Sequence, residues 1–216
     1  MKMKQPNVDA VLEETEDFDA LLEAVRREEQ DIMNCLIRDV FLEGEDLDRI
    51  YFRNVILENC RFVGCDFEKA GFLDVIFRKC DFSNCRFESG YFNRCLIESC
   101  KWMGADMSNG YLQHMTIRDS NLQMANFDHG KLEYIRVEES SLEQAGFSEI
   151  KWKHVEFFHV RLSGASFFKT KLGGMDFTES EIDGLILSDD YSELAGAAVS
   201  PVQAVELAKL LGVIIR

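Results

Sequence analysis

Residues 60–87 read CRFVGCDFEKAGFLDVIFRKCDFSNCRF, and a phenylalanine stands at every fifth position from Phe62 to Phe87. The spacing extends in both directions, because all 31 positions that lie five residues apart from Ile37 to Leu187 hold a large apolar residue. An α-helix repeats every 3.6 residues and a β-strand every two, so neither element explains a period of five. A short repeat of fixed length instead indicates a solenoid, in which each unit packs only on its neighbours.

The position two residues before each large residue is small or β-branched in most units, and Glu45 is its one charged exception. A small inward residue beside a large one lets four short sides close around a narrow, dry axis. The other three positions of each unit are then free to carry polar side chains outward. The pattern therefore predicts a four-sided coil with a continuous apolar core.

Three segments show a family motif plainly: Cys65-Asp66-Phe67, Cys80-Asp81-Phe82 and Ala125-Asn126-Phe127. They resemble the pentapeptide repeat family, whose motif is a small residue, often Asp or Asn, a central Leu or Phe, and two variable residues. The resemblance covers about three quarters of the chain. It implies an all-β fold, a right-handed quadrilateral β-helix with four pentapeptides per coil. We expect this solenoid over residues 32–187, with about eight coils.

Residues 1–31 form an acidic extension outside the repeat, with a net charge of −6. Residues 1–16 are polar and predict no fixed packing. From Asp17, which can cap a helix, apolar residues follow helical spacing and predict a helix over about residues 17–31. Its apolar face comprises Phe18, Leu21, Leu22 and Val25.

An outward stripe of the predicted rod is apolar where polar residues are usual: Ile56, Ile76 and Leu96 lie one coil apart on one face. Such a stripe usually has a partner, and the open end of a solenoid also needs a cover. We expect the apolar face of the N-terminal helix to lie on this stripe. The alternative is that the stripe docks another protein.

Residues 188–216 leave the repeat and predict a connector, a short helix and a short apolar strand. Ser200 and Pro201 start the helix and Gly212 ends it. This tail resembles the C-terminus of the Qnr-type quinolone-resistance proteins, pentapeptide repeat proteins that dimerise tail to tail, and so implies a homodimer. The residues expected at the dimer contact are Val202, Ala204, Leu207, Ala208, Leu211, Val213, Ile214 and Ile215.

The cysteines all occupy the small inward position, where a free thiol packs as a small apolar group. We therefore expect core residues, not disulfides or metal ligands. They are Cys35, Cys60, Cys65, Cys80, Cys85, Cys95 and Cys100. No Ser/His/Asp or Cys/His set converges in the predicted coils, and no glycine-rich phosphate loop is present. We expect no catalytic residue, no metal and no cofactor, and hence no enzyme.

The charge balance limits the partners. The chain has 24 basic and 39 acidic residues, a net charge of −15. An acidic chain repels nucleic acid, so direct binding of nucleic acid is not expected. No apolar run reaches the length of a membrane span, and the polar N-terminus does not resemble a signal peptide. These features predict a cytoplasmic location without membrane binding.

Acidic residues gather on one face when every fourth pentapeptide is aligned, and Arg49, Lys69 and Arg86 interrupt them. This acidic row comprises Asp46, Asp48, Asp66, Glu68, Glu88, Asp106 and Asp128. The Qnr-type resemblance implies a non-enzymatic DNA mimic that binds DNA gyrase or topoisomerase IV, and modulates it or protects it from quinolones or natural toxins. We expect the acidic row to make that contact.

One feature of the repeat departs from the Qnr-type pattern. Loops often interrupt the coils of Qnr-type proteins, and the unbroken repeat from Ile37 to Leu187 leaves no room for one. The alternative function is a generic protein-interaction scaffold or an immunity factor with a different target.

Overall fold

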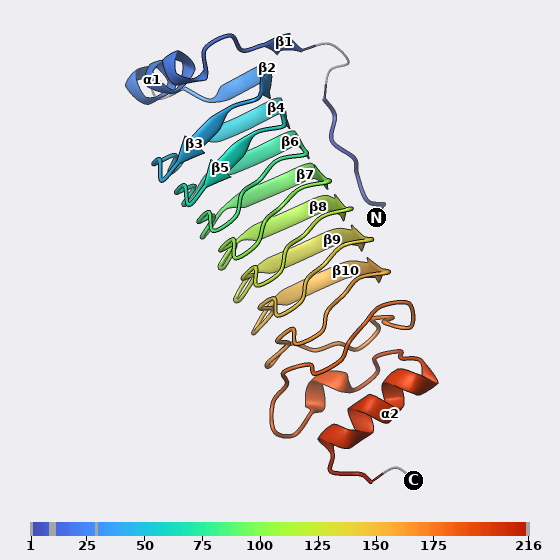
Figure 1. Cartoon of the computed structure of the whole chain (residues 1–216). Helices are drawn as coiled ribbons and strands as arrows, with labels where there is room; N and C mark the ends of the chain where they lie inside the picture. The colour runs from blue at the N-terminus through green and yellow to red at the C-terminus, as the bar shows by residue number, and fades with distance from the viewer. Residues whose placement is uncertain (1, 9–11, 29, 215–216) are drawn as a thin grey trace.

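Parallel strands stacked one per coil run along the rod (Figure 1). The computed structural model describes residues 2–8, 12–28 and 30–214. Each strand residue pairs with the residue twenty positions further on, as Phe52 does with Phe72 and Phe72 with Phe92. Four pentapeptides therefore complete one coil, as the resemblance implied.

The main sheet has the order β1-β2-β4-β6-β7-β8-β9-β10. Its strands are β1 (Glu13–Glu14), β2 (Ile32–Arg38), β4 (Tyr51–Glu58), β6 (Gly71–Arg78), β7 (Tyr91–Glu98), β8 (Tyr111–Arg118), β9 (Lys131–Glu138) and β10 (Lys151–Phe158). A second sheet pairs β3 (Phe41–Glu43) with β5 (Arg61–Val63). Single parallel bridges continue the stack beyond β10, for example Arg161 with Glu181. The solenoid makes about seven turns, one fewer than expected, because the last coil forms no strand in the described chain.

Stacked aromatic rings fill the centre of the solenoid. The ring centroids of Phe67 and Phe87 lie 4.8 Å apart, and those of Phe72 and Phe92 lie 4.6 Å apart. These values match the spacing of about 4.8 Å between paired strands, so the backbone ladder itself sets the stacking distance. The central residues from Phe52 to Trp102 are at most 2% exposed.

At each corner of the coil, the second residue after the central residue has a positive φ and lies in the left-handed region of backbone conformation. This holds for every pentapeptide from Asn34 to Gly174, including Arg49 with φ 54° and Lys69 with φ 58°. A left-handed non-glycine residue costs about 1–2 kcal/mol. The inter-coil hydrogen bonds must offset this strain, since the corner recurs without glycine in most coils.

The cysteines pack as predicted: six are buried and Cys35 is half-buried. Cys60, Cys80 and Cys100 stack in one column, where the amide of Cys60 donates to Cys80 Sγ at 3.4 Å and the amide of Cys80 to Cys100 Sγ at 3.3 Å. Burial raises the pKa of the Cys95 thiol to about 12. The cysteines of the described chain are free thiols.

Helix α1 (Phe18–Glu28) covers the N-terminal end of the solenoid (Figure 1). Asp17 caps it, since its carboxylate accepts a hydrogen bond from the Ala20 amide at 2.9 Å. The Phe18 ring packs edge-on against the core residue Phe62, with centroids 6.1 Å apart, and Leu22 is 4% exposed. The prediction that this helix lies on the outward apolar stripe is wrong. The helix packs on the open end because the aromatic rings there present a larger apolar surface than the three half-exposed aliphatic side chains of the stripe.

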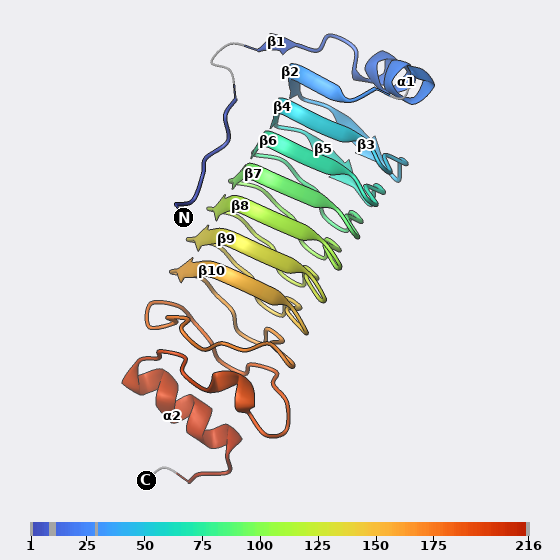
Figure 2. The same cartoon turned by 180° about the vertical axis from the view of Figure 1, so that it is seen from behind.

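The described residues before the helix, 2–8 and 12–16, make contacts with the solenoid, contrary to the prediction for residues 1–16. Strand β1 pairs in parallel with β2, and residues 2–8 run back alongside the strands (Figure 2). The short chain from Glu13 to Glu14 adds an edge strand to β2, which satisfies part of the backbone at the end of the sheet.

Helix α2 (Pro201–Leu210) packs under the last coil after a single 3₁₀ turn, η1 (Ser192–Leu194). Ser200 and Gln203 form a capping box, and Gln203 Nε2 also donates to the carbonyl of Phe177 at 2.8 Å. The predicted terminal strand is absent at Val213 and Ile214, because no neighbouring strand is available to pair with them. None of the described helices combines the length and the apolar composition that a membrane crossing requires.

A ladder of alternating charge climbs one side of the sheet, one residue per coil: Arg38, Glu58, Arg78, Glu98 and Arg118. Arg38 lies 2.8 Å and Arg78 3.6 Å from Glu58, and Arg78 lies 3.1 Å from Glu98. Each inner member contacts an opposite charge above and below. A slip of one coil by a residue would separate these opposite charges, so the ladder favours the native register.

We predict that Glu58→Gln lowers the free energy of unfolding at pH 7 by about 0.2–1 kcal/mol, as for a partly exposed ion pair. The hydrogen bond from Arg38 lowers the pKa of Glu58. A lowered carboxylate pKa stabilises the folded state above the unfolded value of about 4.3, and this contribution is lost as the pH falls below it. Urea unfolding should therefore show a difference between wild type and variant that shrinks below that pH.

The control for this prediction is Glu181→Gln, at an exposed glutamate outside the ladder. It should leave the stability at pH 7 nearly unchanged. A Glu58→Gln difference that stays constant from pH 7 to pH 3 would contradict the electrostatic origin of the effect.

Candidate protein-interaction surfaces

The carboxylates of the acidic row lie in two adjacent columns on one face of the rod. Parallel bridges join Asp46 to Asp66, Asp66 to Arg86, and Arg86 to Asp106. The carboxylates two positions further along belong to the same face: Asp66 accepts a hydrogen bond from the Glu68 amide at 2.8 Å. The coil register thus brings the seven predicted carboxylates together on one side of the rod.

Arg86 lies in the middle of the row and binds three of its carboxylates. Its guanidinium nitrogens lie 3.1 Å from Asp66, 2.7 Å from Glu68 and 2.6 Å from Glu88. Hydrogen bonds from Lys69 and Arg86 lower the pKa of Glu68, which keeps it ionised. With Arg49 also present, seven carboxylates face three cations, and the row keeps a net charge of −4.

The remaining carboxylates are the ones most available to a partner. Asp46, Asp106 and Asp128 form no ion pair with the described residues. Asp106 and Asp128 instead accept hydrogen bonds from the amides of Ser108 at 3.0 Å and Ser148 at 2.7 Å. These bonds fix the orientation of the carboxylates without neutralising them.

The C-terminal element exposes a second, apolar surface. Of the predicted dimer residues, Ala204, Leu207, Ala208 and Leu211 line one shallow hollow of about 470 Å³ with residues of the connector. The most exposed members are Ile214 at 81%, Val202 at 75% and Leu211 at 66%, and Val213 is 49% exposed. Ile215 lies outside the described residues. So many uncovered aliphatic side chains on one small element are typical of a protein contact.

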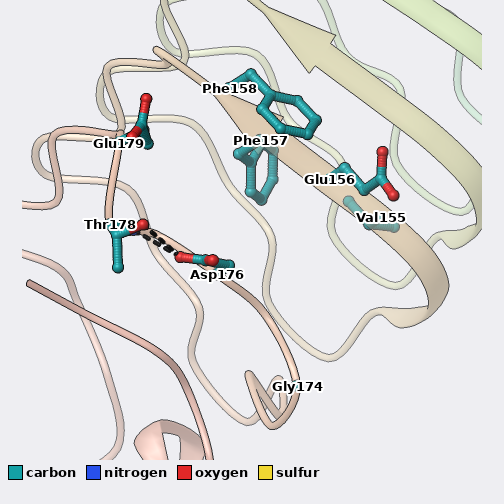
Figure 3. A pocket seen from close by; sticks show the side chains of 8 residues that line it. All are labelled: Val155, Glu156, Phe157, Phe158, Gly174, Asp176, Thr178 and Glu179. Carbon is teal, nitrogen blue, oxygen red and sulfur yellow. Dashed lines mark hydrogen bonds between the residues drawn. The ribbon is translucent and has the colours of Figure 1, made fainter.

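A second hollow, of about 260 Å³, lies beside the last coil (Figure 3). Phe157 and Phe158 form one wall, and the opposite side carries Asp176, whose carboxylate accepts hydrogen bonds from the amide and hydroxyl of Thr178 at 2.9 and 2.7 Å. The Phe158 ring is covered in part by the guanidinium of Arg136 at 4.6 Å. The Thr178 hydroxyl in this hollow is bonded to the Asp176 carboxylate, and the described residues that line the hollow include no histidine, cysteine or lysine. In the parts of the chain that the structure describes, no three His, Cys, Asp or Glu side chains are placed to hold a metal ion.

Sequence reasoning missed a surface feature on the main sheet. The rings of His114, Tyr134 and His154 stack in successive coils, with centroids 4.8 and 4.7 Å apart. The spacing of twenty residues between His114 and Tyr134 and between Tyr134 and His154 was the available signal.

Comparison with known proteins agrees with this architecture. Residues 70–147 match the model of the family described as the pentapeptide repeat region. The repeat of five residues continues on both sides of the matched segment, from Ile37 to Leu187. No curated protein matches the chain.

Solved structures with the same architecture include two trypsin-treated variants of QnrB1, described as a plasmid-mediated fluoroquinolone resistance protein. The first is 23% identical with a TM-score of 0.55, and the match covers 83% of this chain and 99% of that one. The second is 21% identical with a TM-score of 0.46, covering 84% and 100%. HetL, a pentapeptide repeat protein involved in heterocyst differentiation regulation from the cyanobacterium Nostoc sp. strain PCC 7120, is 13% identical with a TM-score of 0.45, covering 82% and 90%. The first of these likenesses shows that the fold is shared.

Proposed function

We propose that this protein is a non-enzymatic DNA mimic that binds DNA gyrase or topoisomerase IV, and modulates the enzyme or protects it from quinolones or natural toxins. The observation that carries the proposal is the acidic row, two adjacent columns of carboxylates along one side of a narrow rod. A protein surface that binds DNA is positively charged and attracts such columns. The fold shared with QnrB1, a fluoroquinolone resistance protein, and the Qnr-type resemblance of the tail favour this target.

Charge density determines which residues should contact the enzyme. The row from Asp46 to Asp128 spans about 20 Å at about 4.8 Å per coil. B-DNA carries about 12 charges over that length, against a net −4 for the row. The mimic is thus weaker than DNA in charge, and its unpaired carboxylates Asp46, Asp106 and Asp128 should contribute most to binding.

The homodimer belongs to the same proposal. Contact between two C-terminal elements would cover their exposed aliphatic side chains. It would also join two rods end to end, so that the dimer carries one acidic row on each rod. A longer surface suits a DNA-binding saddle better than a single rod of seven turns does.

One observation favours the second candidate, a generic interaction scaffold or an immunity factor with a different target. Arg86 neutralises the centre of the acidic row through three short contacts. Lysines also replace tyrosines in another column, where Lys131 lies 4.5 Å from the ring centroid of Tyr111. A surface selected only to imitate DNA would lack such cations.

Charge reversal in the acidic row separates the two candidates. The test variant carries Asp46→Lys, Asp48→Lys, Asp66→Lys and Glu68→Lys. DNA supercoiling by gyrase is measured with and without a quinolone, at increasing concentrations of each protein. We expect wild type to inhibit or protect, and the variant to need at least about tenfold more protein, the equivalent of about 1.4 kcal/mol.

The control reverses four carboxylates on a different column of the rod, and circular dichroism verifies that both variants are folded. Its substitutions are Glu43→Lys, Asp81→Lys, Glu181→Lys and Asp183→Lys. The control should retain the wild-type effect. If wild type has no effect on gyrase or topoisomerase IV at micromolar concentration, the proposal fails and the second candidate is favoured.

A further inference from the structure

Residues 2–8 run as an extended segment alongside the stacked strands of the main sheet (Figures 1 and 2). The amide of Asn7 donates to Asp74 Oδ1 on β6 at 2.9 Å, and the amide of Lys4 donates to His114 Nδ1 on β8 at 3.3 Å. Met3, Pro6 and Val8 are half-buried, and Lys2, Lys4, Gln5 and Asn7 are exposed. We call residues 2–8 the strap.

Burial along one column shows what the strap covers. His114 and Thr116 are outward residues, yet they are only 3% and 8% exposed. The equivalent residues two coils further on, His154 and Glu156, are exposed. The same column includes the apolar stripe of Ile56, Ile76 and Leu96, each half-buried. The strap therefore lies against the part of the sheet around His114.

The contact with His114 requires a neutral imidazole. A neutral ring has one nitrogen that accepts a hydrogen bond, and protonation turns that nitrogen into a donor. Nδ1 is the acceptor here, and it faces the Lys4 amide. A proton on Nδ1 would place two donors against each other and remove one of the two hydrogen bonds that hold the strap.

Charged groups around the ring act in the same direction. Burial, the Lys4 side chain of the strap and Arg94 of β7 lower the pKa of His114, and Glu133 of β9 opposes them more weakly. Tyr134 stacks on the other face of the ring. Removal of the strap takes away Lys4 and the burial that the strap contributes, so the pKa of His114 must rise towards its ordinary value when the strap leaves.

Asp74, which accepts the other hydrogen bond from the strap, does not titrate in the same pH range as His114. Burial acts to raise the pKa of Asp74, but hydrogen bonds from Arg94 and from the Asn7 amide outweigh it and hold the pKa below its usual value. Asp74 therefore stays ionised near neutral pH, and His114 is the group of the two that changes.

We propose that the strap is a pH-gated cover: neutral His114 holds residues 2–8 on the sheet, and protonation of His114 releases them and uncovers the sheet around this residue. Because closure lowers the pKa of His114, closure is favoured above the ordinary value of about 6.5 and weakens as the pH falls below it. The released form exposes the surface around His114 and Thr116, which are 3% and 8% exposed in the closed form. This inference does not depend on the topoisomerase proposal.

The test is an NMR titration of the full chain from pH 7.5 to pH 5.0, which follows the Lys4 and Asn7 amides and the His114 ring. We expect the Lys4 amide to shift with the same midpoint as the His114 ring. In a chain that lacks residues 2–8, His114 should titrate at a higher pH. Binding of a hydrophobic dye to wild type should rise as the pH falls, towards the level of the shortened chain.

Two matched variants identify the switch. His114→Asn keeps an acceptor that does not titrate, and asparagine holds the same left-handed backbone at Asn34 and Asn54 in this column. It should abolish the pH-dependent shift of the Lys4 amide. His154→Asn, in the same stack but outside the strap, should preserve it. A Lys4 amide that ignores the His114 titration, or a His114 midpoint that is unchanged without the strap, would overturn the proposal.

Discussion

Replacing Trp102 by alanine is expected to lower the free energy of unfolding by about 3–5 kcal/mol. Trp102 is fully buried, and its ring lies 4.7 Å from Phe87, 4.8 Å from Phe82 and 5.4 Å from Phe77 between centroids. The wall around it is backbone held by hydrogen bonds to the coils above and below, so it cannot collapse into the space that the indole leaves. The cavity should persist and weaken the stack on both sides.

A comparison of Trp102→Phe with Trp102→Ala separates the effect of ring packing from the effect of the indole N–H. Phenylalanine already fills the same column at Phe62 and Phe82. The substitution also removes an indole N–H that has no hydrogen-bond partner in the described chain. An unsatisfied buried donor costs about 1–3 kcal/mol, which offsets part of the lost ring volume. Trp102→Phe should therefore remain close to wild type in stability.

Urea unfolding followed by circular dichroism measures both variants. Because each coil contacts only its neighbours, the alanine variant should also unfold over a broader range of urea, as the two halves of the rod lose their coupling. Equal unfolding midpoints for the alanine and phenylalanine variants would refute the role of ring packing at this position.

The repeat alone determined which way each residue of the solenoid points. Once the phase is known, the stacking of Cys60 on Cys80 and the alignment of Asp46 with Asp66 follow from the twenty-residue coil. Helix caps were equally readable, since Asp17 and Ser200 act through their own backbone surroundings. These features are local or periodic, and a single sequence contains all the information they need.

The positions of the two termini were not readable in the same way. An apolar helix face fits any apolar surface, and the pattern of Phe18 and Leu22 does not distinguish the stripe from the open end of the coil. The strap contributes only three half-buried side chains and two backbone hydrogen bonds, too few to leave a periodic signal. Its position depends on the His114 acceptor, which the sequence shows only as an outward histidine.

The sequence predicted the position of the acidic row, but it did not predict how far Arg86 neutralises the charge of the row. A twenty-residue spacing placed Arg86 between Asp66 and Asp106, and that much is visible in the sequence. The reach of its guanidinium to three carboxylates depends on side-chain conformation. The charge ladder from Arg38 to Glu98 was visible at the same spacing, and aligning that column as well would have found it.

The C-terminal surface leads to the second large effect: Leu211→Asp combined with Ile214→Asp should convert a dimer into monomers. These side chains are 66% and 81% exposed in the single chain, so aspartate there costs the monomer little. In a dimer the same positions would bury unpaired carboxylates against aliphatic side chains, at a cost of several kcal/mol for the pair. Analytical ultracentrifugation over a range of protein concentrations measures the change.

Met124→Asp is the control, at an exposed apolar residue of the middle of the rod. It should leave the dimer intact. A wild-type chain that stays monomeric at micromolar concentration would exclude the proposed homodimer, and a double variant that stays dimeric would place the contact elsewhere.

The same experiment tests the missing terminal strand. Val213 and Ile214 have no strand in the described part of the chain, where the Val213 amide donates to the Ala208 carbonyl at 3.3 Å. If a second chain supplies a neighbouring strand, the amide of Ile214 should be protected from hydrogen exchange in the wild-type dimer. It should exchange freely in the double variant, because the strand would then exist only across the dimer contact.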